Sequence, residues 1–453
     1  MHILLDAFYL FLLLVLSPWL TYKALTIGKY RRGLWTKFLG LIPRSSLITH
    51  HSSLTCWFHG VSVGEIHLLQ QVVAAFRRRH PDWKCVISTT TDTGMEEARK
   101  RFPDCEVIYW PLDFSWAVRR ALRQLNPDLM VLAEGELWPN FLLAAKERGI
   151  PVAVINGRIS PRSFRRHRFL RPLVAWLLAR IDLLAVQTHE YAERYRELRA
   201  PPGRIHVTGS VKYDGVSGDR NSSRTCELRE LLGVRSDDLV WIAGSTQAPE
   251  EQIALDIYRR ACAEHPNLRL FLVPRQKDRF EEVARMLERS GLPFVRRSEL
   301  GESAERGARS AVSARSALRA PRSAVVLVDT IGELSALWGL ADVAFVGGSL
   351  DGKRGGQNMI EPAAYGAAVV FGPHVWNFRD TAERLVAAAA AIQVRDAGEL
   401  DAVVRRLLKD ADERSRLGEA ARQFVRSQQG ATERTIDLID QLIATRCIRS
   451  EAA

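Results

Sequence analysis

The sequence predicts an α/β protein built from two doubly wound domains, preceded by an apolar N-terminal helix. Short apolar runs alternate with helical patterns along most of the chain, which is typical of mainly parallel sheets wrapped by helices. At 453 residues the chain is too long for one hydrophobic core. A polar segment, residues 214–238, interrupts the alternation near the middle and is the expected interdomain linker. Two such domains place a ligand in the cleft between their strand ends.

Composition narrows the classes of partner. The apolar fraction is 47%, as in globular proteins, and the formal net charge is +12. This charge indicates an anionic partner, which is nucleic acid, anionic lipid or a phosphorylated substrate. The six cysteines form no CxxC pair, so neither a zinc site nor a disulfide framework is indicated. The motifs described below contain no clustered metal ligands, and we expect neither a metal nor another cofactor.

The N-terminal segment is expected to be a membrane anchor over residues 1–25. Residues 3–20 are apolar apart from Asp6 and Ser17, and their number is near the lower limit for a span. No small-residue cleavage site follows. Asp6 counts against a span, and a buried helix of the soluble part is the alternative. The positive-inside rule places the rest of the chain in the cytoplasm because basic residues follow directly, at 23, 29, 31 and 32.

Apolar runs give the expected strands of both domains. In the first domain, residues 26–213, they are residues 54–59, 85–91, 106–110, 129–133, 152–155, 183–186 and 205–207. In the second, residues 239–445, they are residues 240–243, 270–273, 325–328, 343–346 and 368–371. A Ser/Ala/Arg-rich stretch, residues 299–323, is expected to be a surface insertion. One long helical pattern, from about 413 to 445, ends the second domain.

The most informative stretch is residues 341–368. An apolar strand leads at once into Gly347 and Gly348, and a helix begins near Asn358. A strand, a glycine turn and a helix N-terminus can form an anion cradle, because free N–H groups and the helix dipole face one point. Glu361 in the first helical turn could accept hydrogen bonds from a ribose diol. An ordinary strand-to-helix connection with a capping acid is the alternative.

Acidic residues follow two predicted strands of the first domain. Glu65 opens a helix after the first strand, where it could act as a general base or merely as a helix-terminal acid. Glu134 and Glu136 follow a fully apolar strand, in a turn stiffened by Trp138 and Pro139. Acids at the carboxyl end of a strand are more often site residues than acids elsewhere.

Basic residues gather between positions 158 and 171, where six arginines and no acid occur. Arg158 and Arg162 begin this run, and Phe164 and Phe169 are interleaved with it. The pattern indicates a membrane-surface patch or a phosphate site. Nucleic-acid binding is disfavoured because no nucleic-acid module accompanies the arginines. Lys212, just before the linker, either faces the cleft or is solvated.

Two more turns in the second domain are candidate phosphate contacts. Gly244 and Ser245 follow a strand and precede a helix, so their N–H groups could meet a phosphate. Arg275 stands at a strand end, where a guanidinium can grip a phosphate bidentately. Either turn could instead be ordinary loop chemistry.

Taken in order, these motifs resemble those of a known family. After the apolar anchor the chain reads WFHGVSVGE, TTTDTG, YWPLD, EGELWPN, NGRIS, TGSVKYD, AGST, VPR, GGQNMIEP and GPHVWNFRD. This set, spanning residues 30–384, closely resembles the 3-deoxy-D-manno-octulosonic acid (Kdo) transferases of lipopolysaccharide synthesis. The resemblance implies a two-domain GT-B glycosyltransferase fold, CMP-Kdo as donor and a lipid A precursor, lipid IVA, as acceptor. It also implies metal-independent inverting transfer at the cytoplasmic face of the inner membrane.

The resemblance assigns roles to individual residues. The family base falls on Glu65, and the carboxylate of the ELWPN motif falls on Glu134 or Glu136, with Glu134 preferred. Lys212 matches a lysine near the cleft. The donor nucleotide would be held by a set in the second domain, with Arg275 on the phosphate and Glu361 on ribose: Gly244, Ser245, Arg275, Gly347, Gly348, Asn358 and Glu361.

Three positions depart from the family pattern. Gln247, Gln276 and Gln357 stand where the family usually has histidine. Glutamine keeps hydrogen bonding but carries no charge and shuttles no proton. The donor, the acceptor and the number of sugars added therefore stay open. A transferase using a UDP-sugar and a non-catalytic homologue that binds nucleotide or lipid are the alternatives.

Overall fold

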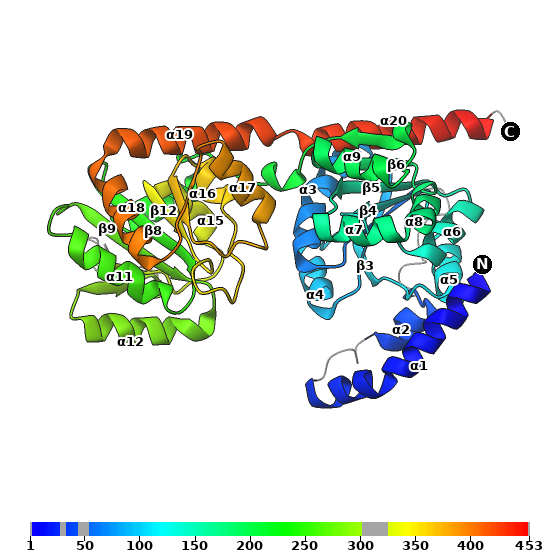
Figure 1. The fold of residues 1–453 in the computed structure, drawn as a ribbon, viewed down its shortest axis with the longest axis horizontal. Helices are drawn as coiled ribbons and strands as arrows, with labels where there is room; N and C mark the ends of the chain where they lie inside the picture. The colour runs from blue at the N-terminus through cyan, green and yellow to red at the C-terminus, as the bar shows by residue number, and fades with distance from the viewer. Residues whose placement is uncertain (1, 28–32, 44–53, 301–324, 452–453) are drawn as a thin grey trace, which may run out of the picture. The chain divides into compact units, whose positions relative to one another are not determined.

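The computed structural model describes residues 2–27, 33–43, 54–300 and 325–451. The chain divides into two compact units, each a parallel sheet with helices (Figure 1). The first unit comprises residues 1–215 and 428–453, and the second comprises residues 216–427. Most of the predicted surface insertion, residues 301–323, lies outside the described residues.

The first unit contains a seven-stranded sheet in the order β3-β2-β1-β4-β5-β6-β7, with every pairing parallel. Its strand order reverses between β1 and β4, which makes this the switch point where such sheets bind ligands. The strands are β1 (Thr55–His59), β2 (Lys84–Thr89), β3 (Glu106–Tyr109), β4 (Leu129–Ala133), β5 (Val152–Gly157), β6 (Leu183–Val186) and β7 (Ile205–Val207).

Helices cover both faces of this sheet, and the core explains why. Trp57 and Met130 point into one apolar cluster, whereas Phe58 and Val131 point into another, so β1 and β4 are buried on both sides. A parallel sheet covered on both faces needs such continuous apolar strands. The helices are α3 (Val63–Arg79), α4 (Asp92–Arg101), α5 (Ser115–Leu125), α6 (Pro139–Glu147), α7 (Pro161–Phe169), α8 (Arg171–Leu178) and α9 (His189–Glu197).

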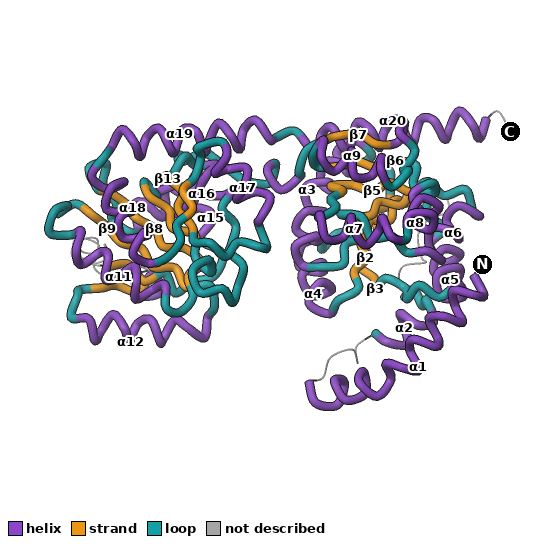
Figure 2. The backbone as a smooth tube through the Cα atoms, viewed as in Figure 1, coloured by secondary structure: helices purple, strands orange, loops and turns teal. Residues whose placement is uncertain are grey.

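The second unit repeats this architecture, as the alternation of helix and strand in Figure 2 shows. The sheet order is β10-β11-β9-β8-β12-β13-β14, with the switch point between β8 and β12. The strands are β8 (Leu239–Thr246), β9 (Leu268–Pro274), β10 (Phe294–Arg296), β11 (Val325–Leu327), β12 (Val343–Val346), β13 (Ala368–Phe371) and β14 (Ile392–Gln393). The helices are α10 (Ser223–Leu231), α11 (Glu250–Ala261), α12 (Phe280–Ser290), α15 (Leu334–Leu337), α16 (Ile360–Ala364), α17 (Arg379–Ala387), α18 (Ala397–Lys409) and α19 (Ala411–Gln428).

The predicted fold class, two doubly wound domains, is confirmed. Every apolar run predicted as a strand forms one. The sequence missed only the edge strands β10 and β14 among those described, which are three and two residues long. Runs this short carry too little periodicity to be distinguished from loops.

The segment predicted as an interdomain linker, residues 214–238, contains a helix, α10, that packs on the second unit. Ser222 caps α10, whose Thr225 and Leu228 are buried in the second unit. The division between the units falls at Gly215 and Val216. The helix escaped prediction because two buried side chains make a weak pattern within a polar stretch.

The C-terminal helical pattern is also divided. Gly430, at φ +88°, separates α19 from α20 (Ala431–Glu451), because this left-handed conformation suits glycine. Although the sequence places residues 239–445 in one domain, α20 belongs to the first unit. Ile436 and Ile439 are fully buried in that unit's core.

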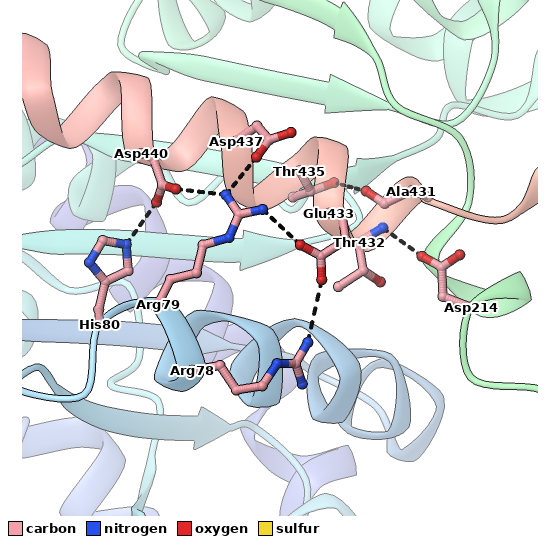
Figure 3. Close-up of polar contacts among 10 residues, drawn as sticks. All are labelled: Arg78, Arg79, His80, Asp214, Ala431, Thr432, Glu433, Thr435, Asp437 and Asp440. Carbon is pink, nitrogen blue, oxygen red and sulfur yellow. Dashed lines mark hydrogen bonds and ion pairs between the residues drawn. The ribbon is translucent and has the colours of Figure 1, made fainter.

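Polar contacts fix α20 on the first unit (Figure 3). Asp214 accepts hydrogen bonds from the amides of Gly430 and Thr432 at 2.7 and 2.5 Å and so caps the helix. Arg79, at the end of α3, pairs with three carboxylates of α20, those of Glu433, Asp437 and Asp440. The return of the chain to the first unit is thus fixed by both an apolar seam and a charged one.

The N-terminal helix α1 spans His2–Ile27, close to residues 1–25 predicted for the anchor. Residues His2–Trp19 are long and apolar enough to cross a membrane, by length and composition only. Large apolar side chains on α1 are exposed, among them Phe11 at 61% and Leu14 at 72%. A short helix, α2 (Leu34–Leu39), follows it.

Candidate functional site

The acids of the first unit meet at its switch point. Glu65 lies in the first turn of α3, directly after β1, and Glu134 and Glu136 follow β4, the neighbouring strand. Their charges act on one another. Glu134 contributes to raising the pKa of Glu65, and both contribute to raising the pKa of Glu136. The structure therefore brings together three predicted site residues from two distant segments.

Glu65 is held firmly. The amide of Val61 donates to its Oε2 at 2.8 Å, and the hydroxyl of Ser62 donates to its Oε1 at 2.9 Å. Ser62 is also the N-cap of α3 and accepts from the amide of Glu65. Burial raises the pKa of Glu65, and these hydrogen bonds oppose the shift. A fixed carboxylate with a raised pKa suits a general base, and the same contacts also cap the helix.

Glu134 is neutralised by two cations. Arg158 Nε lies 2.8 Å from one carboxylate oxygen, and Lys212 Nζ lies 3.4 Å from the other. The backbone of Glu134 has φ +64°, an uncommon conformation for a residue with a Cβ. Such local strain clusters at functional sites. Of the two arginines predicted here, Arg158 joins the acids, whereas Arg162 is exposed on the first turn of α7.

Glu136 is the most perturbed of the three acids. Burial, followed by the nearby charge of Glu65, raises its pKa to about 7. Its Oε2 is buried, and the side chain of Trp138 opposes the rise in pKa only in part. The sequence prefers Glu134 over Glu136 for chemistry, and this choice stays a prediction, but the two acids lie in different surroundings. Glu134 is committed to an ion pair, and Glu136 exchanges a proton near neutral pH.

The pKa of Glu136 predicts a pH-dependent change in stability. Between pH 4.5 and about 7 the native carboxyl keeps a proton that the unfolded chain has released. Stability therefore falls as pH rises through this window. We expect Glu136→Gln to gain thermal stability relative to the wild type between pH 5 and pH 8. The same substitution at exposed Glu193 should show no such trend, and an equal trend in both variants would contradict the assignment.

Sequence reasoning missed Asn156, which lies near the end of β5, the strand that pairs with β4. Its side chain is fully buried, and its Oδ1 accepts from the amide of Val211, the residue before Lys212. Its own carbonyl accepts from the side chain of Gln187. Asn156 has φ +53°, so asparagine meets both the hydrogen-bonding and the backbone requirement. The Asn-Gly dipeptide at 156–157 could have indicated this left-handed conformation from the sequence.

In the second unit, the glycine turn after β12 already holds a carboxylate. The amides of Gly348, Ser349 and Leu350 donate to Glu250 at 2.7–3.0 Å, and so does the amide of Gln247. Glu250 is completely buried. The predicted anion cradle is therefore occupied by the protein's own side chain, and those amides are not free for a phosphate.

Packing accounts for two of the candidate glycines. A Cβ on Gly244 would lie 2.5 Å from the ring of Trp338, and one on Gly347 would lie 2.7 Å from Glu250. Such approaches do not occur in folded proteins, so both positions require glycine. Ser245, near the end of β8, has φ +55° and is another residue with an uncommon backbone conformation at a strand end.

The other three donor candidates gather around Glu361. Asn358 donates to its Oε1 at 2.9 Å, and the charge of Arg275 acts on it. Burial is the dominant effect and raises the pKa of Glu361. Arg275 itself is exposed beyond β9. The arrangement offers a guanidinium, an amide and a carboxylate to one ligand.

A cavity of about 300 Å³ lies in the second unit. It is lined by Gln247 and Gln276, two of the glutamines that depart from the family pattern. Three cations and three acids complete the lining: Arg279, Lys353, Arg354, Asp278, Glu282 and Asp351. Within the described ranges, no group of three His, Cys, Asp or Glu side chains could hold a metal ion.

Comparison with known proteins gives consistent results. The family model for 3-deoxy-D-manno-octulosonic-acid transferase (kdotransferase) matches residues 34–215. A 3-deoxy-D-manno-octulosonic acid transferase of Haemophilus influenzae is 33% identical over 385 residues, covering 84% of this chain and 86% of the relative. The Chlamydophila psittaci enzyme of the same name is 30% identical over 432 residues, covering 95% and 94%.

Solved structures support the architecture. The crystal structure of MurG from Acinetobacter baumannii superposes with a TM-score of 0.52 and covers 86% of this chain and 99% of that one. Its sequence identity is 16%, so the likeness concerns the fold alone. A glycosyltransferase of Rickettsia africae gives a TM-score of 0.53 at 13% identity, covering 87% of this chain and 99% of its own.

Proposed function

Because the chain belongs to the 3-deoxy-D-manno-octulosonic acid transferase family, a family of GT-B glycosyltransferases, we propose that it transfers Kdo from CMP-Kdo to lipid IVA. The observation that carries the catalytic part is the meeting of Glu65, Glu134 and Glu136 at the switch point of the first unit. Sheets of this class bind ligands at that point.

The proposed reaction is a direct displacement at the anomeric carbon. The acceptor hydroxyl gives its proton to Glu65 as its oxygen bonds to the sugar. The bond between the sugar and the phosphate breaks at the same time, and CMP leaves with the electron pair. This single displacement requires one base, and it inverts the configuration of the anomeric carbon. Glu134, held by Arg158 and Lys212, keeps these cations beside the base.

The second unit is the proposed donor site. Arg275 would meet the phosphate, since a guanidinium matches its geometry. Glu361, kept in place by Asn358, would accept from the ribose hydroxyls. Lys353 and Arg354, which line the 300 Å³ cavity together with three acids, are the proposed contacts of the sugar carboxylate. Gly348 was predicted to bind the donor phosphate through its amide. That amide instead donates to Glu250 and holds the loop after β12 in place.

The acceptor side is proposed to face a membrane. Phe169 is 89% exposed and Leu170 51% exposed beside the arginines of α7. Arginines interleaved with exposed apolar side chains suit an anionic lipid surface. Together with α1, they support a location at the cytoplasmic face of the inner membrane.

The test is product formation by the purified full-length chain. We expect lipid IVA to gain the mass of Kdo when CMP-Kdo is supplied, and no sugar from a panel of UDP-sugars. Transfer from a UDP-sugar alone would show that the three glutamines mark another donor. No transfer from any donor, with CMP still bound, would support a binding protein.

Activity is expected to survive chelation. Charge on the departing CMP would be stabilised by the guanidinium of Arg275, so no metal takes part. Turnover should be unchanged after dialysis against EDTA. Activity that is lost with EDTA and restored by Mg²⁺ would contradict this mechanism.

A further inference from the structure

The first two turns of α1 are joined to the first unit by polar contacts, which we call the latch (His2, Asp6 and Tyr9). Asp6 accepts from the amide and hydroxyl of Ser115 at 2.8 and 2.5 Å and from Asn140 Nδ2 at 3.0 Å. It is only 8% exposed, although it lies in an apolar helix. Asp6, whose charge argues against a membrane span in the sequence, is thus hydrogen-bonded to side chains and backbone of the first unit.

The other two latch residues reinforce this contact. Tyr9 donates to Asp113 Oδ2 at 3.0 Å, and its ring packs edge-on against Phe114. His2 bonds to Asn140 Oδ1 at 2.7 Å and to Glu147 at 2.9 Å. The N-terminal end of α1 is therefore held on α5 and α6.

The other end of α1 is tied to the same place through α2. The carbonyl of Lys37 accepts from the amide of Leu112, and the carbonyl of Phe38 accepts from the indole of Trp116, both at 2.9 Å. Phe38 also packs on Phe114, the ring that Tyr9 contacts. Both ends of α1 thus lead to one short segment, residues 112–116.

This double attachment excludes a membrane span while the latch is closed. A helix that crosses puts its ends on opposite sides of a hydrocarbon layer about 30 Å thick. The chain from Ile27 to Gly33 reaches at most about 21 Å when fully extended. It contains Lys29, Arg31 and Arg32, which cannot return through hydrocarbon. If instead His2 lay on the far side, Asp6 could not reach Ser115.

Resting on the proposed membrane location, we propose that α1 is an in-plane anchor, with both ends on the side of the catalytic units. Its exposed side chains Phe8, Phe11, Leu14, Val15 and Trp19 enter the outer acyl layer of an anionic bilayer. The inference replaces the transmembrane anchor expected from the sequence. The latch joins the anchor to Asn140, six residues from Glu134.

Thiol accessibility tests this topology in the full-length chain. Ile3→Cys, at an 81% exposed position, is introduced with the native cysteines replaced, and a membrane-impermeant maleimide is added to intact spheroplasts or to inverted inner-membrane vesicles. Glu288→Cys, exposed on α12, marks the side of the catalytic units. We expect both thiols to be labelled only in inverted vesicles, and Leu14→Cys to be protected in both preparations.

Labelling of Ile3→Cys only in intact spheroplasts, with Glu288→Cys labelled only in vesicles, would show that α1 spans and would overturn the inference alone. Rapid labelling of Leu14→Cys in vesicles would show that α1 lies outside the lipid and would also overturn it. Recovery of the chain in the soluble fraction would instead contradict the proposed membrane location. The two failures are thereby distinguishable.

Discussion

Glu65→Gln is expected to lower turnover with CMP-Kdo and lipid IVA by about 10²–10⁴-fold, the usual cost of losing a general base. Glutamine preserves size and still accepts from the amide of Val61, so α3 keeps its cap. What disappears is a carboxylate whose pKa is raised by burial and by Glu134. The measurement is kcat with the purified variant.

Two controls separate chemistry from folding and from donor binding. CMP affinity should stay within about twofold in Glu65→Gln, because the proposed nucleotide contacts lie in the second unit. Glu361→Ala should do the opposite, weakening CMP binding first. Near-normal turnover in Glu65→Gln would remove it from the mechanism and make Glu136, the acid with a pKa of about 7, the next candidate base.

Glu250→Ala is expected to destabilise the second unit severely. Four backbone amides, including those of Gly348 and Gln247, would lose a fully buried acceptor. Each unsatisfied buried donor costs about 1–3 kcal/mol, so even after relaxation we expect a loss of at least about 3 kcal/mol. Thermal unfolding of the full chain should show an early transition or none.

Gln252→Ala is the matched control for Glu250→Ala. Gln252 lies on the same helix and is exposed, and such surface changes stay within about 0.5 kcal/mol. Equal unfolding temperatures for the two variants would contradict the structural role of Glu250. If Glu250→Ala stays folded but no longer binds CMP, Glu250 would be needed to shape the donor site through the loop after β12 and not for the stability of the second unit.

Local pattern was enough to predict the fold and the position of the acids. Buried parallel strands such as β4 are apolar throughout, so each stood out from its polar surroundings. Glu65 and Glu134 were singled out because each follows a predicted strand. That these strands, β1 and β4, are neighbours and bring the acids together is seen only in the structure.

The remaining features depended on contacts between distant segments. Glu250 takes the amides of a turn about 100 residues away, so nothing near Gly348 in the sequence revealed that the cradle was filled. Glu134 differs from Glu136 because it forms ion pairs with Arg158 and Lys212, which come from two later segments of the chain. The latch is similar, because Asp6 finds its partners more than 100 residues on.

The stereochemistry of the product tests the central claim most directly. Direct displacement with Glu65 as the base predicts that Kdo transferred from CMP-Kdo to lipid IVA has the opposite anomeric configuration to the donor. NMR of the isolated glycolipid made by the wild-type enzyme determines it. An inverted anomeric centre is the result we predict, and a retained configuration would require a second displacement and contradict the single-base mechanism.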